Sequence, residues 1–316
     1  MAAFRFEVGP EDDGQRIDQV LVRRLPGMSR ARAKALTEAG EVRLNGKRVR
    51  KSQLVYAGDL VSVEHLPPRV DFEAMPDSSL SLRLLAQRRD FVVVDKPAGV
   101  PSHPLREGEL GTLAGALLAK FPEMRGVGYS AREPGIVHRL DVDTSGLMLA
   151  ARNAKAFEAL REQLRASRIT KHYLALCSGR VEAPQEVAYP IENHRRDARK
   201  VVAVTEPGRT SQGNRAPAAK ESLSEILKSS PQGDFSLVEI RANHARRHQV
   251  RVHCASIGHP LAGDRLYGGP VLSGLGRHFL HASRLAFCDP STGEPVSFSL
   301  ELPADLKEVL RRLAQA

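Results

Sequence analysis

The sequence has no tryptophan, only three cysteines, and no apolar run close to the roughly 20 residues that a membrane-spanning helix requires. Aromatic residues make up 5% of the 316 residues, which argues against an extensive platform for stacking single-stranded bases. Residues 1–7 lack the apolar core of a secretory signal. We therefore expect a cytoplasmic protein that does not insert into a membrane.

The three cysteines, Cys177, Cys254 and Cys288, are scattered, and no C-x-x-C pair is present. This spacing argues against a disulfide framework and against a zinc site, so we expect buried thiols in a reducing compartment. The chain also lacks the G-x-x-x-x-G-K-[ST] phosphate-binding loop and the glycine run of a Rossmann fold. We therefore expect no nucleotide cofactor.

The sequence is rich in positive charge, with 47 Lys and Arg against 37 Asp and Glu, which gives a net charge of +10. Such an excess favours a polyanionic partner, because clustered cations release counterions from a phosphate backbone. A content of 41% hydrophobic and 27% charged residues is typical of a globular protein. The length predicts one large domain and a smaller one, and a monomer is the default expectation.

Composition divides the chain into three parts. Residues 12–66 have the pattern of a small separate domain, residues 67–79 are Pro-rich and predict a linker, and residues 80–316 form the large domain. In the large domain, strand patterns occur at 91–94, 169–179, 235–241 and 296–302, and helical patterns at 112–121, 154–166, 248–257 and 304–313. Because strands and helices do not alternate regularly, a mixed α+β fold is favoured over a doubly wound one.

Basic residues are concentrated in the small domain, on a predicted helix at 30–39 and on the hairpin that follows it. The simplest interpretation is a solvated face. Because alternate helix positions and the adjacent hairpin both carry the charge, the pattern also favours one positive surface. The residues expected to form this surface are Arg30, Arg32, Lys34, Arg43, Lys47 and Arg48.

The most informative stretch is H-R-L-D-V-D-T-S-G at residues 138–146. It lies between apolar runs at 135–137 and 147–151, which predict two strands joined by a polar bend. A carboxylate on such a bend is held by rigid flanks and faces a cleft, so Asp141 is a candidate catalytic residue. An Asx-turn, in which Asp141 or Asp143 bonds its own backbone, explains the same residues.

Three further patterns are ambiguous when each is taken alone. The K-P-A-G string at 96–99 is typical of an ordinary turn. Tyr173 alternates with apolar neighbours, as a core tyrosine does. His244 and His248 have the i, i+4 spacing of metal ligands, but no acidic or cysteine ligand accompanies them, so we expect no metal.

Together these strings resemble the motifs of pseudouridine synthases of the RluA type. Residues 138–146 are similar to that family's H-R-L-D-x-x-T-S-G motif, and residues 246–264 to its R-T-H-Q-I-R-V-H and G-H-P-L-x-G-D motifs. At 244–247 the sequence H-A-R-R replaces the family's T-G-R-T. Residues 14–64 resemble the S-four RNA-binding domain, and the motifs follow family order over nearly the whole chain.

The resemblance implies an α+β protein with a small N-terminal S-four-like domain of α/β type. A large, mixed and mainly antiparallel sheet with flanking helices would form its catalytic domain. The implied activity is that of an RNA pseudouridine synthase, which detaches uracil from ribose and rejoins it through carbon 5, with no cofactor. Structured RNA of the large ribosomal subunit is the favoured substrate, and transfer RNA is the alternative.

The resemblance also implies roles for single residues. Asp141 is implied as the catalytic carboxylate, Arg251 as its basic partner, and Tyr173 as the residue that stacks on the target base and assists proton transfer. The residues expected to bind the substrate, by lining the uracil pocket or by holding the space left by the extruded base, are Leu280, Arg139 and His138.

Two other functions are compatible with parts of this pattern. A non-catalytic RNA-binding or ribosome-assembly factor would share the fold, but it has no chemical need for Asp141, Tyr173 and Arg251 together. A nucleoside hydrolase-like enzyme would release free uracil and would need clustered Asp residues for a metal, which the sequence does not have.

Overall fold

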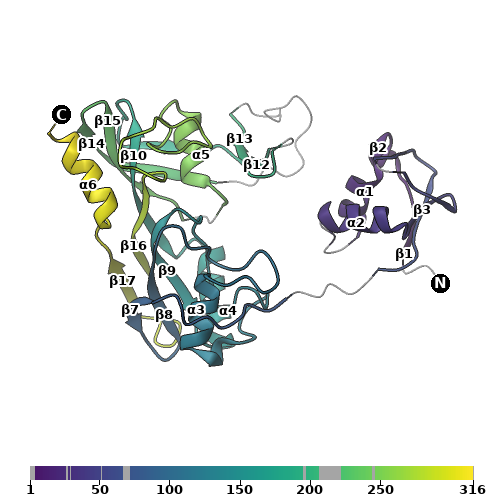
Figure 1. The fold of residues 1–316 in the computed structure, drawn as a ribbon, viewed down its shortest axis with the longest axis horizontal. Coiled ribbons are helices and arrows are strands. Elements are labelled where there is room, and N and C mark those ends of the chain that lie inside the picture. Colours follow the sequence, from purple (N-terminus) through teal and green to yellow (C-terminus); the bar gives the residue numbers. More distant parts are fainter. Residues whose placement is uncertain are drawn as a thin grey trace. The chain divides into compact units, whose positions relative to one another are not determined.

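The computed structural model describes residues 4–25, 28, 30–50, 52–66, 72–194, 197–205, 222–243 and 246–315, without the side chains of residues 30 and 31. The chain divides into two units, residues 1–70 and 71–316, and each has a hydrophobic core of its own (Figure 1). The finer limits at 12–66 and 80–316 stay a prediction. Among the described residues, no helix has both the length and the apolar content to cross a membrane.

Apolar side chains at helical spacing build the first unit. Helix α1 (Ile17–Arg24) buries Ile17, Val20 and Leu21, which share one helix face, and it packs against α2 (Arg30–Ala39). One sheet contains, in spatial order, β1 (Phe4–Glu7), β6 (Leu60–Val63), β3 (Val42–Leu44) and β4 (Lys47–Arg48). A separate pair is formed by β2 (Gln15–Arg16) and β5 (Leu54–Val55), and a 3₁₀ turn covers Pro10–Asp12.

A long, mainly antiparallel sheet forms the centre of the second unit. Its strands, in spatial order, are β11 (Gln185–Val187), β14 (Ser224–Gln232), β15 (Phe235–Arg241), β10 (Thr170–Ser178), β16 (Leu280–Cys288), β9 (Ser145–Ala151), β8 (Phe91–Lys96) and β7 (Arg83–Gln87), and β17 (Pro295–Ser299) pairs with β16. Only the β16–β9 contact in this sheet, as described, is parallel. A separate hairpin joins β12 (Ile191–Asn193) and β13 (Val201–Ala203).

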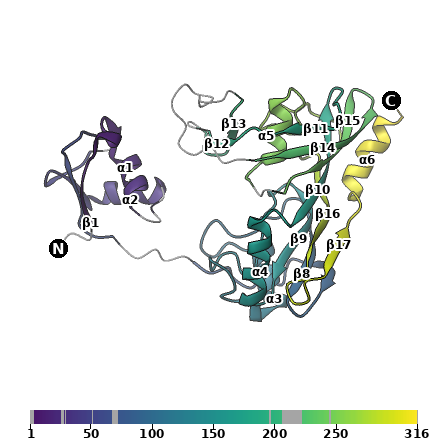
Figure 2. The ribbon, with the colours of Figure 1, turned by 180° about the vertical axis from the view of Figure 1, so that it is seen from behind.

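Alternating side chains along the strands place helices on both faces of this sheet. Val92 packs in the core cluster that contains α3 and α5, whereas its neighbour Val93 packs in the cluster that contains α4. On the α4 face, α6 packs with Leu176. Both ribbon views show α6 alongside the sheet near β16 and β17, and α3 and α4 by β8 (Figure 2). The helices are α3 (Leu113–Lys120), α4 (Ala154–Arg165), α5 (Gln249–Ser256) and α6 (Ala304–Leu313), with a 3₁₀ turn at Pro122–Met124.

The expected α+β architecture with a mainly antiparallel sheet is confirmed. The strand and helix patterns predicted in the large domain correspond to β8, β10, β15, β17 and α3 to α6. The strand predicted at 135–137 is wrong, because Ile136 forms only an isolated bridge with Ala150. Gly135 has a φ of +67°, which lies outside the extended region and ends any strand there.

Part of the predicted linker packs on the second unit. Residues 67–71 lie outside the described part of the chain. Ala74 is buried, and its N–H donates to the carbonyl of Ala131 at 3.1 Å. The carboxylate of Asp77 accepts a hydrogen bond from the N–H of Gly111 at 2.7 Å. Residues 74–77 of the predicted linker are therefore anchored to the second unit.

The parallel contact between β9 and β16 determines where the bend at residue 141 lies. It pairs Ser145 with His281 and Gly146 with Ala282. Gly146 has a φ of +121°, and a Cβ there would lie 2.3 Å from the carbonyl oxygen of Ala282. Only glycine permits this approach, so the residues just before β9 are held beside the start of β16.

We predict that Gly146→Ala lowers the free energy of unfolding by at least about 2 kcal/mol, because the added methyl group meets backbone atoms of β16. Urea unfolding of the variant and the wild type measures this change. Gly108→Ala is the matched control, since Gly108 also has a positive φ (+76°) but a Cβ there meets no atom within 4 Å. Equal stability of the two variants would contradict the close approach of the strands.

Candidate active site

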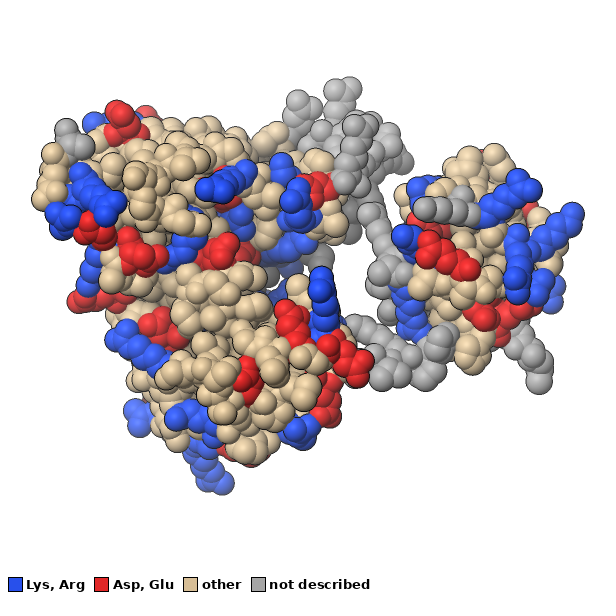
Figure 3. All heavy atoms as spheres, viewed as in Figure 1, with Lys and Arg blue, Asp and Glu red and all other residues tan. Residues whose placement is uncertain are grey.

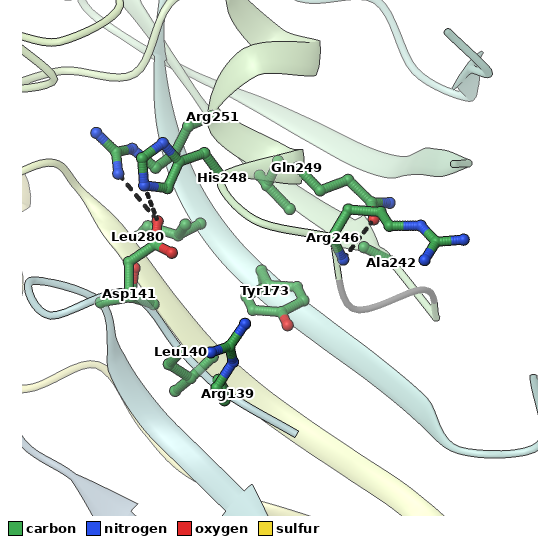
Figure 4. A pocket seen from close by; sticks show the side chains of 12 residues that line it. Arg139, Leu140, Asp141, Tyr173, Ala242, Arg246, His248, Gln249, Arg251 and Leu280 are labelled. Carbon is green, nitrogen blue, oxygen red and sulfur yellow. Dashed lines mark hydrogen bonds and ion pairs between the residues drawn. The ribbon is translucent and has the colours of Figure 1, made fainter. Parts of the chain in front are cut away.

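A pocket opens where α5, β10 and the start of β16 meet the bend that carries Asp141 (Figure 4). The space inside it, counted together with the open solvent at its mouth, is about 400 Å³. The residues predicted from the sequence that line it are Arg139, Asp141, Tyr173, Arg251 and Leu280. Further lining comes from Leu140, Thr144, Ala242, Arg246, His248, Gln249 and Val250.

Arg251, on α5, carries the central positive charge of the pocket. Its side chain is only 8% exposed, and Nη1 donates to Oδ2 of Asp141 at 2.9 Å. Nε and Nη2 donate to the two carboxylate oxygens of Asp264 at 2.7 and 2.9 Å, which forms a bidentate pair. Burial alone would lower the pKa of Arg251, but hydrogen bonding to Asp264 and the charge of Asp141 raise it above its ordinary value. A charged guanidinium therefore faces Asp141.

Asp264 and Tyr267 support Arg251 from behind. Burial would raise the pKa of Asp264, but the hydrogen bonds from Arg251 outweigh this and lower it. The guanidinium carbon of Arg251 also lies 5.2 Å from the centre of the Tyr267 ring, within the range of a cation–π contact. The orientation of Arg251 is thus set by groups that do not themselves line the pocket.

The two carboxylate oxygens of Asp141 have different surroundings. Oδ2 accepts the hydrogen bond from Arg251 and lies 3.9 Å from Nε2 of His248. In the described part of the chain, no hydrogen bond reaches Oδ1. Figure 4 shows both contacts on one oxygen, while the other faces the side of the pocket where Tyr173 lies. Oδ1 is therefore the oxygen available to a ligand.

Strands β10 and β16 supply an aromatic and an apolar wall. Tyr173 is 9% exposed, and burial together with the nearby charge of Asp141 raises the pKa of its phenol. Its hydroxyl therefore stays protonated at neutral pH. Leu280, the first residue of β16, is buried beside it in the same core cluster. A planar ligand could stack on the tyrosine ring against this apolar side.

Of the two other residues predicted to bind the substrate, Arg139 lines the pocket and His138 does not. Arg139 lines the pocket with its side chain 56% exposed, and its Nη1 lies 3.2 Å from Oε1 of Glu133 and 3.4 Å from Nε2 of His103. His138 does not line the pocket. It is buried, and its Nε2 accepts the N–H of Leu149 at 3.2 Å. Burial lowers the pKa of His138 to about 3, so the ring is a neutral internal support.

Residues 140–144, which we call the Asp141 loop, are held by a buried lysine. Lys96, at the end of β8, donates from Nζ to the carbonyls of Pro97, Val100 and Val142 at 2.8, 2.8 and 2.9 Å. Burial lowers the pKa of Lys96 to about 7, and the carboxylates of the loop oppose this fall. Three carbonyl acceptors match the three donors of an ammonium group, so Lys96 fastens the loop to the 96–100 turn.

The other end of the Asp141 loop is held by the segment that precedes β16. Arg277 donates from Nη1 to the carbonyl of Asp143 at 3.0 Å and pairs through Nε with Asp305 at 2.8 Å. Nε2 of His278 lies 2.8 Å from Oγ1 of Thr144. Burial lowers the pKa of His278 to about 4, so this ring is also neutral. The loop is therefore fixed by side chains from the two strand regions that flank β9, namely the end of β8 and the segment before β16.

The sequence analysis did not identify several of these supporting residues, namely Lys96, Asp264, Arg277 and His278. Lys96 lies in a string that is typical of a turn, and Arg277 and His278 lie in no motif considered. One usable signal is a charged residue at the end of an otherwise apolar strand, as Lys96 is the last residue of β8. Such a charge must find partners when it is buried, so it marks a place where another segment packs.

On the first unit, two exposed residues of the expected basic surface lie on β4. Lys47 and Arg48 are both exposed, and Figure 3 shows Lys and Arg side chains along both edges of this unit. Arg43, opposite Arg48 in the β3–β4 hairpin, forms an ion pair with Glu64. The hairpin therefore offers two cations that can approach a phosphate backbone without giving up this ion pair.

The basic residues of α2 are less available. Lys34 is exposed, but its Nζ lies 3.7 Å from Oε1 of Glu38 on the next turn. Arg32 is partly buried, and the side chain of Arg30 lies outside the described part. The structure thus places the five of these residues whose side chains it describes at positions of different accessibility.

The segment that departs from the family pattern is partly described. His244 and Ala245 lie outside the described residues. Arg247 donates to the carbonyls of Ala198 and Lys200 at 3.0 and 2.8 Å, which ties the start of α5 to the β12–β13 hairpin. Within the described residues, no three His, Cys, Asp or Glu side chains are grouped so as to hold a metal ion.

Comparison with known families gives two matches along the chain. Residues 90–256 match the family described as RNA pseudouridylate synthase, and residues 15–61 match the S4 domain. The first match spans more than half of the chain and contains the whole Asp141 loop. The second falls within the first structural unit.

Curated relatives match over nearly the full length. An uncharacterized RNA pseudouridine synthase of Chloroflexus aurantiacus is 36% identical over 308 residues, which cover 97% of this chain and 92% of the relative. A protein of Xylella fastidiosa named ribosomal large subunit pseudouridine synthase D is 34% identical over 315 residues, covering 96% of this chain and 90% of the relative.

Two solved structures match over about three quarters of the chain. The structure titled human RNA pseudouridylate synthase domain containing 1 has a TM-score of 0.54 at 28% identity, covering 76% of this chain and 98% of its own. The one titled human RNA pseudouridylate synthase domain containing 4 has a TM-score of 0.55 at 25% identity, covering 73% and 92%.

We predict that Lys96→Met loosens the Asp141 loop, because a charge-assisted hydrogen bond to the carbonyl of Val142 is lost. The amides of Gly99 and Thr144, which bond to loop carbonyls, should exchange with solvent about tenfold faster. Hydrogen exchange followed by mass spectrometry measures this. Lys120→Met, at the exposed end of α3, is the control and should leave these amides unchanged. Unchanged exchange in Lys96→Met would contradict the role of Lys96.

Proposed function

The chain belongs to the RNA pseudouridylate synthase family, and we propose that it isomerises uridine in large-subunit ribosomal RNA with Asp141 as its catalytic carboxylate. The family expected from the sequence is confirmed, and with it the class of enzyme, an isomerase. One observation carries the assignment of Asp141. Its carboxylate lies in the pocket with Oδ2 held by Arg251 and Oδ1 open to a ligand.

The isomerisation places a clear demand on that carboxylate. The bond between N1 of uracil and C1′ of ribose breaks, a bond between C5 and C1′ forms, C5 loses its hydrogen and N1 gains one. A carboxylate can assist by attacking the anomeric carbon, by attacking the uracil ring or by removing a sugar proton. Each route uses an oxygen that no protein donor occupies, and Oδ1 of Asp141 meets this requirement.

The neighbouring residues support the same proposal. Arg251 orients Asp141 through Oδ2 and stabilises its charge. The ring of Tyr173 stacks on the uracil, its protonated hydroxyl assists proton transfer, and Leu280 closes the apolar side of the pocket. The target base must leave its stack to reach these largely buried groups, and the exposed Arg139 holds the space that it leaves. His138 then acts through its support of β9.

Two features support large-subunit ribosomal RNA as the substrate. A full-length relative carries that substrate in its name, and the chain has an S4 domain in addition to the catalytic unit. We propose that the basic residues of this domain contact phosphates of structured RNA and position the target. These residues are Arg30, Arg32, Lys34, Arg43, Lys47 and Arg48.

We predict that Asp141→Asn abolishes release of tritium from carbon-5-tritiated uridine in large-subunit ribosomal RNA transcripts, because the amide cannot act as nucleophile or base. Asp143→Asn is the matched control. Asp143 belongs to the same loop but does not line the pocket, so its variant should release tritium within about twofold of the wild type.

The possible results separate the proposals. Release by Asp141→Asn at the wild-type rate would contradict the assignment of the catalytic residue. Wild-type release from transfer RNA but not from ribosomal RNA would contradict the proposed substrate. Tight binding of either RNA with no release by the wild type would instead favour a non-catalytic RNA-binding factor.

We predict that the double variant Lys47→Ala, Arg48→Ala weakens RNA binding and lowers the slope of log affinity against log salt by about 1.5, the effect of losing two phosphate contacts. Fluorescence anisotropy at several salt concentrations measures the slope. Lys155→Ala, at an exposed position of α4 in the other unit, is the control and should keep the wild-type slope. An unchanged slope in the double variant would contradict an RNA contact at β4.

A further inference from the structure

His248 has a backbone conformation that is uncommon for residues other than glycine. It directly precedes α5 and has a φ of +55° and a ψ of 19°, in the left-handed region. Residues other than glycine are uncommon there, although asparagine, aspartate and histidine are enriched among them, and they cluster at functional sites because the surrounding structure must hold them. In this chain the conformation directs the imidazole into the pocket, where its edge faces Asp141 (Figure 4).

A tyrosine determines which ring nitrogen of His248 carries the proton. The hydroxyl oxygen of Tyr267 accepts the N–H of Val201 at 3.0 Å and lies 2.9 Å from Nδ1 of His248. Burial raises the pKa of Tyr267, so its hydroxyl keeps its proton, and because its oxygen already accepts from Val201 we assign the O–H as the donor to Nδ1. A neutral imidazole that accepts at Nδ1 must carry its hydrogen on Nε2.

The imidazole itself stays neutral. Burial lowers the pKa of His248, and the charges around it act in both directions: Asp141 and Asp264 favour protonation, and Arg251 and Arg247 oppose it. The N–H of Nε2 is thus presented to the carboxylate of Asp141, with 3.9 Å between Nε2 and Oδ2. Hydrogen bonds of catalytic groups often shorten when a substrate fills the site.

The segment around His248 is fastened from outside the pocket. Arg247, its neighbour, donates to the carbonyls of Ala198 and Lys200 in the β12–β13 hairpin, and the Tyr267 hydroxyl accepts from Val201 of the same hairpin. The hairpin therefore holds both the backbone before α5 and the side chain that orients the imidazole. This gives the strained residue the support that its conformation requires.

We propose that His248 is a positioning residue of the reaction: its Nε2–H and the guanidinium of Arg251 together engage Oδ2 of Asp141, which leaves Oδ1 as the reacting oxygen. This proposal rests on the proposed catalytic role of Asp141. Arg251 supplies charge, and His248 adds a second, neutral donor from another direction. With two donors on one oxygen, the carboxylate cannot rotate to exchange its oxygens without losing both contacts.

Two substitutions separate the two nitrogens of the ring. His248→Asn places an amide where Nδ1 lies, so it keeps an acceptor for Tyr267, and asparagine tolerates the left-handed conformation. It removes the group that faces Asp141. His248→Gln extends an amide donor to the position of Nε2 and restores that group. Single-turnover rates and RNA affinities of both full-length variants are measured beside the wild type and Asp141→Asn, with the unfolding midpoint of each.

We expect His248→Asn to lower the single-turnover rate at least about tenfold, while the Kd for RNA stays within about twofold of the wild-type value. We expect His248→Gln to return the rate to within about threefold of the wild type. Wild-type rates in both variants would overturn the proposal, and so would equal losses in both or a loss confined to RNA affinity. Asp141→Asn separates this from the proposed function: if it retains activity, the catalytic assignment itself fails, whatever the His248 variants do.

Discussion

The guanidinium of Arg251 is almost excluded from water, and a charge in that position must be paired by acceptors of opposite charge. Asp264 takes two of its donors in a bidentate pair, which leaves Nη1 directed at Asp141. The positive charge of Arg251 in the pocket is therefore fixed in position by its pair with Asp264, which does not line the pocket. Because that pair is buried, removing Asp264 leaves Arg251 with Asp141 alone among the carboxylates of the described residues, so the geometry of Asp141 depends on a residue that does not line the pocket.

The same requirement explains how a short loop can be held firmly. The Asp141 loop exposes backbone carbonyls that no strand partner satisfies, and Lys96 and Arg277 supply the donors from β8 and from the segment before β16. The parallel contact between β9 and β16, which Gly146 permits, brings those two segments to the same place. Sheet topology, buried cations and one glycine thus act together to place a single carboxylate in the proposed site.

Much of the fold can be predicted from local patterns, because helices such as α4 bury one face and begin at a capping residue, here Asn153. Strand β14 could not be predicted in this way, because its Ser, Lys and Pro residues do not alternate with apolar ones. Motif resemblance predicted Asp141, Tyr173, Arg251 and Leu280, and the structure brings these four to one pocket. It could not predict the supporting contacts of Lys96, because they join segments that are distant in the sequence.

The most direct test of this account is the single-turnover rate of Asp264→Asn on ribosomal RNA transcripts at neutral pH, with the unfolding midpoint measured on the same sample. Asp264 does not line the pocket, and its carboxylate accepts from Arg251 and from the amides of Leu266 and Tyr267, so its effect on the reaction is indirect. The account predicts a rate at least about tenfold below the wild type, with RNA affinity within about twofold. A folded variant that reacts at the wild-type rate would contradict the claim that the buried pair positions Asp141.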